Sequence, residues 1–153
     1  MLACVAGAQI EIRWARDVED VRGAFALREA VFYGEQNVPR EEDVDELDRD
    51  ARQLVALDPE GGDVIGTLRL LSFGAEAKIG RVAVAAQWRR RGIASQMLEI
   101  ALARAREQGF ERVRLAAQVV AVALYEQAGF AVESAPFQEA GIEHVWMGIT
   151  LSR

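Results

Sequence analysis

Three consecutive arginines, at positions 89–91, stand directly before Gly92 in the segment "RVAVAAQWRRRGIASQML" (81–98). The residues before them alternate as in a strand, and the residues after them repeat as in a helix. A helix that begins near Gly92 exposes free backbone N–H groups, and its macrodipole adds partial positive charge there. Glycine lets an anion approach the backbone, and guanidinium groups add charge-assisted hydrogen bonds. The segment therefore predicts a site for a pyrophosphate-bearing ligand; the alternative is a basic turn that is simply solvated.

Three other side chains have the chemistry of acids or bases. Tyr125 lies in "LYEQAGF", and a tyrosine whose pKa is near 10 stays protonated at neutral pH and can donate a proton to a leaving group. His144 is the only histidine, and imidazole is a common general base near neutral pH. Glu35, which follows Gly34, is the competing base. Each also has a purely structural interpretation. Tyr125 would be an aromatic residue of the core, His144 a hydrogen-bonded structural histidine and Glu35 an exposed carboxylate.

Two charged segments have more than one interpretation. Arg69, in "GTLRLL", is expected either to anchor a carboxylate of an acceptor or to pair with a nearby acid. The acidic stretch "EEDVDELDRD" (41–50) lacks the glycine and the spacing of a calcium loop, although it contains Asp43, Asp45 and Asp48. A solvated turn is the default for such a stretch, and the alternative is a set of acids that attracts a cationic amine. No metal site is expected.

The helices and strands that position these residues are predicted from hydrophobic periodicity and from residues that begin or end a helix. A strand at 10–14 precedes a helix that Asp17 caps and that ends near Gly34. The most regular helix runs over 93–108 and stops at Gly109. The other elements are strands at 53–58, 64–71, 77–84, 112–117, around 131–137 and at 144–151, and a short helix at 119–128. Strands outnumber helices and most connections are short, so we expect an α+β fold with a mixed, mostly antiparallel sheet.

Composition excludes several classes of protein. The 153 residues, 51% hydrophobic, suit one domain with one core over 1–153. A net charge of -6 and a pI near 4.9 argue against a nucleic-acid surface. The lone Cys4 allows no internal disulfide, and neither a membrane span nor a signal peptide is recognised, so a cytoplasmic location is expected. No P-loop and no G-x-G-x-x-G occurs, so ATP and NAD are poor candidates.

Four motifs resemble those of the GCN5-related N-acetyltransferases (GNAT). The segment "RRRGIA" (89–94), after "VAV" (82–84), is similar to the acetyl-CoA signature R/Q-x-x-G-x-G/A of that superfamily. "LYEQAGF" (124–130) resembles its L-Y-x-x-x-G-F element. "AVFYGEQNVP" (30–39) and "GIEHVWM" (141–147) look like the ElaA-like branch. The motifs occur in order and span about 30 to 150.

The resemblance implies a sheet of six or seven strands and about four helices in α/β/α layers. The sheet would splay near its middle, so that the pantetheine arm of acetyl-CoA inserts between the fourth and fifth strands. Gln118 stands where many members have asparagine. The cofactor-binding residues implied are Val82, Ala83, Val84, Arg89, Arg90, Arg91, Gly92, Ile93, Ala94, Ser95, Gln118 and Tyr125.

The implied activity is an acetyl-CoA-dependent N-acetyltransferase in which a primary amine attacks the thioester directly in a ternary complex. Tyr125 would protonate the departing thiolate of coenzyme A, with His144 or Glu35 as the base. Arg69, Glu35 and His144 would border the acceptor. The alternative is a catalytically silent acyl-CoA-binding regulatory or interaction module.

The acceptor stays open at this point, because one scaffold serves many substrates. A small polyamine-like molecule, an amino acid derivative, an antibiotic and a protein terminus are all compatible with the sequence. Trp14 and Trp146, near the termini, would support a homodimer.

Overall fold

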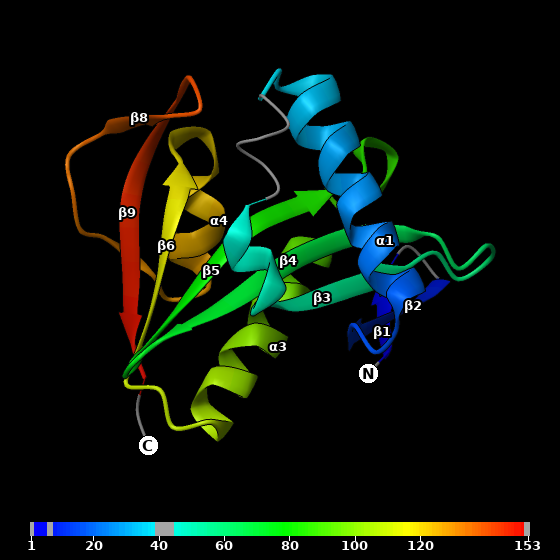
Figure 1. Cartoon of the computed structure of the whole chain (residues 1–153), viewed down its shortest axis with the longest axis horizontal. Helices are drawn as coiled ribbons and strands as arrows, with labels where there is room; N and C mark the ends of the chain where they lie inside the picture. Colours follow the sequence, from blue (N-terminus) through cyan, green and yellow to red (C-terminus); the bar gives the residue numbers. More distant parts are fainter. Residues whose placement is uncertain (1, 6–7, 39–44, 152–153) are drawn as a thin grey trace.

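The computed structural model describes residues 2–5, 8–38 and 45–151 (Figure 1). Within these ranges nine strands form one sheet in the order β1-β2-β3-β4-β5-β6-β9-β7, and β8 pairs with β9. The strands are β1 (Leu2–Val5), β2 (Ala8–Trp14), β3 (Arg52–Leu57), β4 (Val64–Phe73), β5 (Glu76–Val84), β6 (Arg112–Gln118), β7 (Ala131–Val132), β8 (Phe137–Glu139) and β9 (Ile142–Thr150).

All neighbouring strands are antiparallel except β5 and β6, which are parallel. The prediction of a mixed, mostly antiparallel sheet is therefore confirmed. The sequence did not predict β1, which extends the sheet beyond β2. The single strand expected around 131–137 is instead two short strands, with Pro136, which has no N–H to donate to a ladder, between them.

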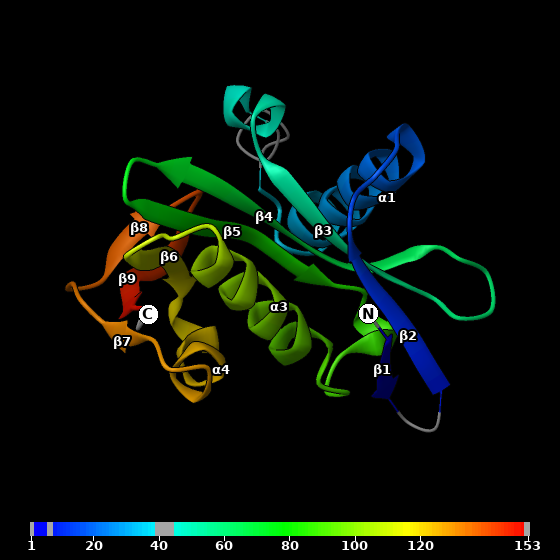
Figure 2. The ribbon, with the colours of Figure 1, turned by 90° about the horizontal axis from the view of Figure 1, so that it is seen from below.

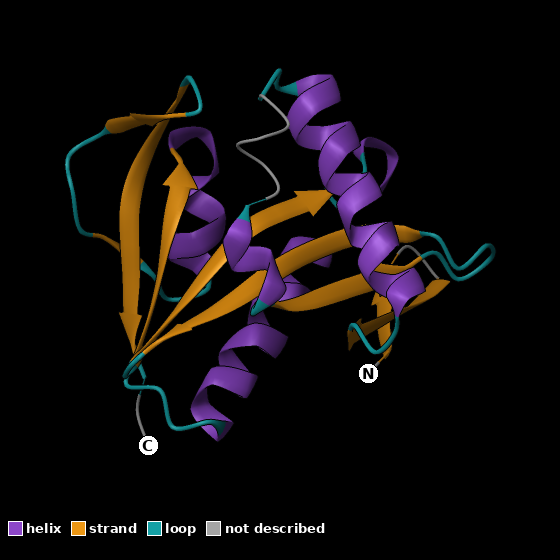
Figure 3. Ribbon diagram, in the orientation of Figure 1, coloured by secondary structure: helices purple, strands orange, loops and turns teal. Residues whose placement is uncertain are grey.

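The helices cover both faces of the sheet. They are α1 (Val18–Arg28), continued by the π-helix η1 (Glu29–Glu35), then η2 (Glu46–Arg49), η3 (Ala86–Trp88), α3 (Ile93–Glu107), η4 (Val119–Ala121) and α4 (Val122–Gln127). Figure 2 shows α1 on one face and α3 with α4 on the other, and Figure 3 separates helices from strands by colour. None of these helices, within the described ranges, has the length and apolarity needed to cross a membrane.

Two of the predicted helices start and end where local signals placed them. The Asp17 carboxylate accepts a hydrogen bond from the Asp20 backbone N–H at 2.9 Å, so it caps α1. The helical stretch then reaches Glu35, although its last turns are π-helical. α3 ends just before Gly109, whose φ is +80°.

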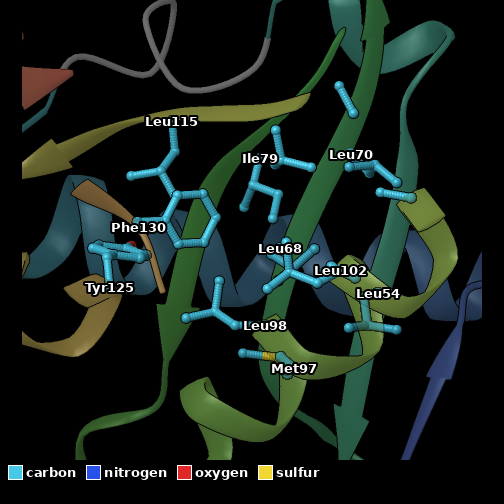
Figure 4. Close-up of a cluster of buried hydrophobic side chains, with 14 of the residues drawn as sticks. Leu54, Leu68, Leu70, Ile79, Met97, Leu98, Leu102, Leu115, Tyr125 and Phe130 are labelled. Atoms are coloured by element: carbon cyan, nitrogen blue, oxygen red, sulfur yellow. The ribbon is translucent and has the colours of Figure 1, made fainter. Parts of the chain in front are cut away.

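The main core lies between the sheet and the pair α3 and α4. Met97, Leu98 and Leu102 of α3 pack on strand residues that include Leu68 and Ile79 (Figure 4). Each fully buried side chain of this kind contributes about 1.5–3 kcal/mol. A Cβ at Gly66 would lie 3.0 Å from the Ile93 side chain, so glycine lets β4 pass close to the start of α3 without displacing that side chain. This packing fixes the N-terminus of α3 against the sheet.

The sheet divides between its two parallel strands. Residues 76–79 of β5 pair with residues 112–115 of β6, but the pairing stops there. Both strands continue, and Figure 1 shows them diverging from their meeting point. On the other side of β5, the pairing with β4 slips between Thr67 and Arg69, which gives β5 one extra residue. Arg81 lies in this bulge with φ +54°.

Candidate active site

A cavity of about 810 Å³ occupies the opening between β5 and β6. Four parts of the fold contribute to its wall. They are residues 78–84 of β5, the α4 helix, the end of η1 and the β8–β9 hairpin. The cavity brings together ten residues that the sequence singled out: Asp45, Arg69, Val82, Ala83, Val84, Arg89, Ala94, Gln118, Tyr125 and His144. Glu35, Arg90, Arg91, Gly92, Ile93 and Ser95 do not line it.

The turn before α3 is open to an anion. Gly92 is the N-cap residue of α3 with φ +81°, and no side chain caps this helix end. A Cβ at Gly92 would meet nothing within 4 Å, so the left-handed backbone, rather than crowding, requires glycine. The first helical hydrogen bond runs from Gln96 N to Gly92 O, so the N–H groups of 93–95 precede the helical ladder. The Ile93 side chain is buried in the core, which leaves only its backbone for a ligand.

The three arginines of the loop differ in their contacts. Arg89 donates from Nε to the carbonyl of Val84 at 2.9 Å and pairs with Glu35 at 2.9 Å. The Arg91 guanidinium lies 4.8 Å from the Trp88 ring centroid. Arg90 is exposed and has φ +64°. Glu35 therefore lies against this loop, on the cofactor side of the predicted site.

Tyr125 faces the cavity from α4 with only 7% of its surface exposed. Its ring contacts Phe130 edge to face, with 6.2 Å between the centroids. Burial disfavours the phenolate and raises the pKa of Tyr125 to about 12. The hydroxyl group therefore keeps its proton at neutral pH, as a general acid must.

The buried side chain of His144 is oriented by its neighbours. Nδ1 lies 2.7 Å from the carbonyl oxygen of Ile142, and a carbonyl only accepts, so Nδ1 carries the hydrogen. Nε2 of the neutral ring then has a free lone pair. It lies 3.8 Å from a carboxylate oxygen of Glu139, and the ring stacks on Phe137 at 6.0 Å.

A network of ion pairs reaches the cavity through Asp45, Arg69 and Arg81, which line it, and includes Arg28 and Asp48, which do not. Arg69 contacts Asp45 at 2.8 Å and Asp48 at 3.2 Å, Arg28 makes two hydrogen bonds to Asp48, and Arg81 reaches Asp45 at 3.3 Å. Burial of the Asp48 carboxylate would raise its pKa, but the hydrogen bonds and charge of Arg28, with the charge of Arg69, lower it to about 2. Arg69 therefore pairs with local acids, one of the two predicted alternatives.

The prediction of a solvated turn is wrong for Asp48, whose side chain is 5% exposed. Asp43 lies outside the described residues. Among the residues that the structure does describe, no group of three His, Cys, Asp or Glu side chains is placed to hold a metal ion.

Gln118 bridges the two sides of the opening. Its side-chain amide donates to the Gln36 side-chain oxygen at 2.9 Å, and both residues line the cavity. This contact joins the end of β6 to the end of η1.

Backbone strain collects around the same cavity. In the described chain, four residues other than glycine have a positive φ: Asn37, Arg81, Arg90 and Ala140. Arg81 and Ala140 line the cavity, Asn37 lies between two lining residues, and Arg90 follows lining residue Arg89. Strained backbone of this kind concentrates at functional sites.

Lys78 and Glu139 also line the cavity, and the sequence analysis missed both. Lys78 alternates with apolar residues of β5, which made it resemble a solvent-facing position. One signal was available: Lys78 is the only lysine among 18 basic residues.

Comparisons with known proteins agree with this geometry. The family model described as "Acetyltransferase (GNAT) domain" matches residues 22–151. The uncharacterized N-acetyltransferase YjcF of Bacillus subtilis strain 168 is 34% identical over 134 residues, which cover 87% of this chain and 94% of YjcF.

Two solved structures share the fold over nearly their whole length. A Lactobacillus plantarum protein assigned provisionally as an N-acetyltransferase is 28% identical, covers 94% of this chain and 99% of its own, and has a TM-score of 0.86. Escherichia coli ElaA is 24% identical, and the match covers 97% of this chain and 99% of ElaA with a TM-score of 0.79. The Lactobacillus plantarum likeness agrees with the resemblance seen in the motifs, and the ElaA likeness shows a shared fold.

Proposed function

Because this chain belongs to the GNAT acetyltransferase family, we propose that it transfers the acetyl group of acetyl-CoA to a primary amine by direct attack in a ternary complex. One observation carries the proposal. The cavity between the diverging strands brings the β5 edge, the Arg89 loop, Tyr125 and His144 to a single space.

The cofactor side of the cavity suits coenzyme A at two points. The edge of β5 at residues 82–84 is not paired with β6, so its N–H and C=O groups can pair with the pantetheine amides like an added strand. The open N-terminus of α3 and the guanidinium groups of residues 89–91 suit the pyrophosphate. Acetyl-CoA is thus the cosubstrate that the proposal assigns.

His144 is the preferred base. Its Nε2 has a free lone pair at the cavity and can accept a proton from the amine before attack. Glu35 is the weaker candidate, because its carboxylate is held by Arg89 and lies outside the cavity lining.

Tyr125 is the proposed acid. The amine nitrogen bonds to the thioester carbonyl carbon, the carbon–sulfur bond breaks, and the thiolate takes the phenolic proton of Tyr125. The phenol is protonated at neutral pH, and burial raises the pKa of Tyr125 to about 12, which favours this neutral form.

The test is release of free thiol from acetyl-CoA in the presence of a panel of amines. Tyr125→Phe is expected to lower kcat about 100-fold, because it removes the phenolic proton and keeps the ring. Tyr33→Phe is the matched control, because Tyr33 is the only other tyrosine and is exposed. A silent binding module would instead be stabilised against heat by coenzyme A and release no thiol above background.

A further inference from the structure

Lys78 differs from every arginine that lines the cavity. Arg69, Arg81 and Arg89 each have a carboxylate partner within 3.3 Å. Lys78 has no ion pair within 4.0 Å among the described residues. Its ammonium nitrogen lies instead 5.1 Å from the centroid of the Trp146 ring, which holds the cation by its π face.

The surroundings of Lys78 favour an added negative charge. The side chain is half-buried, and burial lowers the pKa of Lys78. The charges of Arg69 and Arg81 lower it further, against the opposing effects of Glu139 and Asp45. A half-buried ammonium without an anionic partner is costly, so a ligand that supplies a carboxylate would be stabilised there.

Among the described residues, the acids Asp45 and Asp48 already hold cations of the chain itself. The carboxylates of Asp45 and Asp48 are engaged by Arg28, Arg69 and Arg81. Of the lining carboxylates, Glu139 keeps an exposed side chain, and it lies next to Nε2 of His144. Negative charge is thus available beside the proposed base, and positive charge is available at Lys78.

The order of residues along β5 places Lys78 beyond the reacting end of the cosubstrate. With the pyrophosphate at residues 89–95 and the pantetheine along residues 84–82, the thioester lies toward Gly80. Lys78 is two residues further, about 7 Å along the strand. An acceptor whose amine lies at His144 can therefore extend toward Lys78.

We propose that the acceptor is a small molecule of the amino acid class, with a carboxylate near its primary amine, and that Lys78 binds this carboxylate. The inference rests on the proposed function. It replaces the earlier candidate, Arg69, whose terminal nitrogens are occupied by Asp45 and Asp48.

The experiment compares amino acids with their carboxamides as acceptors in pairs, by kcat/KM for thiol release. The wild-type protein is expected to prefer the acids by about 10-fold to 100-fold, the effect of one hydrogen-bonded charge pair. Lys78→Met should remove this preference while changing kcat/KM for the amides less than about threefold, and Lys78→Arg should retain most of it. Arg114→Met is the matched control, because Arg114 also packs on Trp146, at 4.7 Å, but does not line the cavity.

A second measurement does not depend on turnover. Calorimetry on the protein with coenzyme A bound should show tighter binding of N-acetylated amino acids than of their amides, and Lys78→Met should abolish the difference. Equal use and equal binding of acids and amides by the wild-type protein would overturn the inference.

Self-acetylation of Lys78 would also overturn the proposal that Lys78 binds the acceptor carboxylate. If acetyl-CoA alone adds an acetyl group to Lys78, detected by intact mass and absent in Lys78→Arg, the lysine is a substrate and not an anchor. The proposed function fails in a different way, by absence of thiol release with every amine, acid or amide.

Discussion

The arginines on the two sides of the cavity have the same guanidinium chemistry and very different surroundings. Arg89 and Arg90 are exposed on the loop before α3, and Arg89 pairs with the equally exposed Glu35. Arg69, which lines the cavity, and Arg28, which does not, are 3% and 0% exposed and hold carboxylates that are partly or largely buried. An exposed ion pair can be replaced by another partner at little cost in free energy. Loss of one member of a buried ion pair is costly, because the other charge stays buried without compensation from it. The first set is therefore suited to binding a ligand, and the second to holding the wall.

The largest expected effect is on the buried side. Asp48→Asn should lower the free energy of unfolding by about 3–5 kcal/mol, because it removes the charge of the buried carboxylate that accepts two hydrogen bonds from the buried Arg28 guanidinium. Urea denaturation measures this. Asp50→Asn, at an exposed position in the same acidic stretch, should change stability by less than about 0.5 kcal/mol. Equal stability of the two variants would contradict the contrast between buried and exposed charge.

The same carboxylate predicts a loss of stability in acid. Its pKa is lowered from 3.8 to about 2, so ionised Asp48 stabilises the fold above about pH 4, by about 2 kcal/mol. This contribution disappears as pH falls from about 4 to about 2, because the unfolded chain takes up the proton first. Unfolding free energies measured across this range should fall more steeply for the wild-type protein than for Asp48→Asn. Parallel curves would show that Asp48 is not the titrating group.

On the exposed side the effect should be on binding alone. Arg89→Ser combined with Arg90→Ser should weaken coenzyme A binding about tenfold or more and leave the urea midpoint unchanged. Arg106→Ser, at the exposed C-terminal end of the same helix, is the control. Pantetheine lacks the diphosphate, so its binding should be equal in all three proteins. Undiminished coenzyme A affinity in the double variant would remove the basis for a pyrophosphate site.

The smallest effect is expected at Glu35. Its pair with Arg89 is exposed, so Glu35→Gln should change kcat and coenzyme A affinity less than about fivefold. If Glu35 were the base, kcat would fall about 100-fold. Steady-state kinetics over pH separates these outcomes and sharpens the choice of His144.

Local signals in the sequence predicted the junction between β5 and α3. Around position 90 the apolar residues change from strand-like alternation to helix-like repetition, and Gly92 follows. These two features mark a strand-to-helix junction, and both depend only on neighbouring residues. The buried wall depends on pairs far apart in the chain. Arg28 and Asp48 are 20 residues apart, and each resembles a surface charge until the fold brings them together. Lys78 was missed for the same reason, because only the splay turns that face of β5 into a cavity wall.

Because β5 and β6 diverge, the sheet has two unpaired strand edges in its interior, in addition to the edges of its outermost strands. Unpaired backbone at the outer rim of a sheet invites strands of other chains and hence aggregation. Here residues 80–84 and 116–118 face one another across the opening, with further strands behind each. A molecule as narrow as one extended chain, with amides at peptide-like spacing, could pair with these strand edges. The unpaired edges therefore suit an extended ligand that carries its own amide groups.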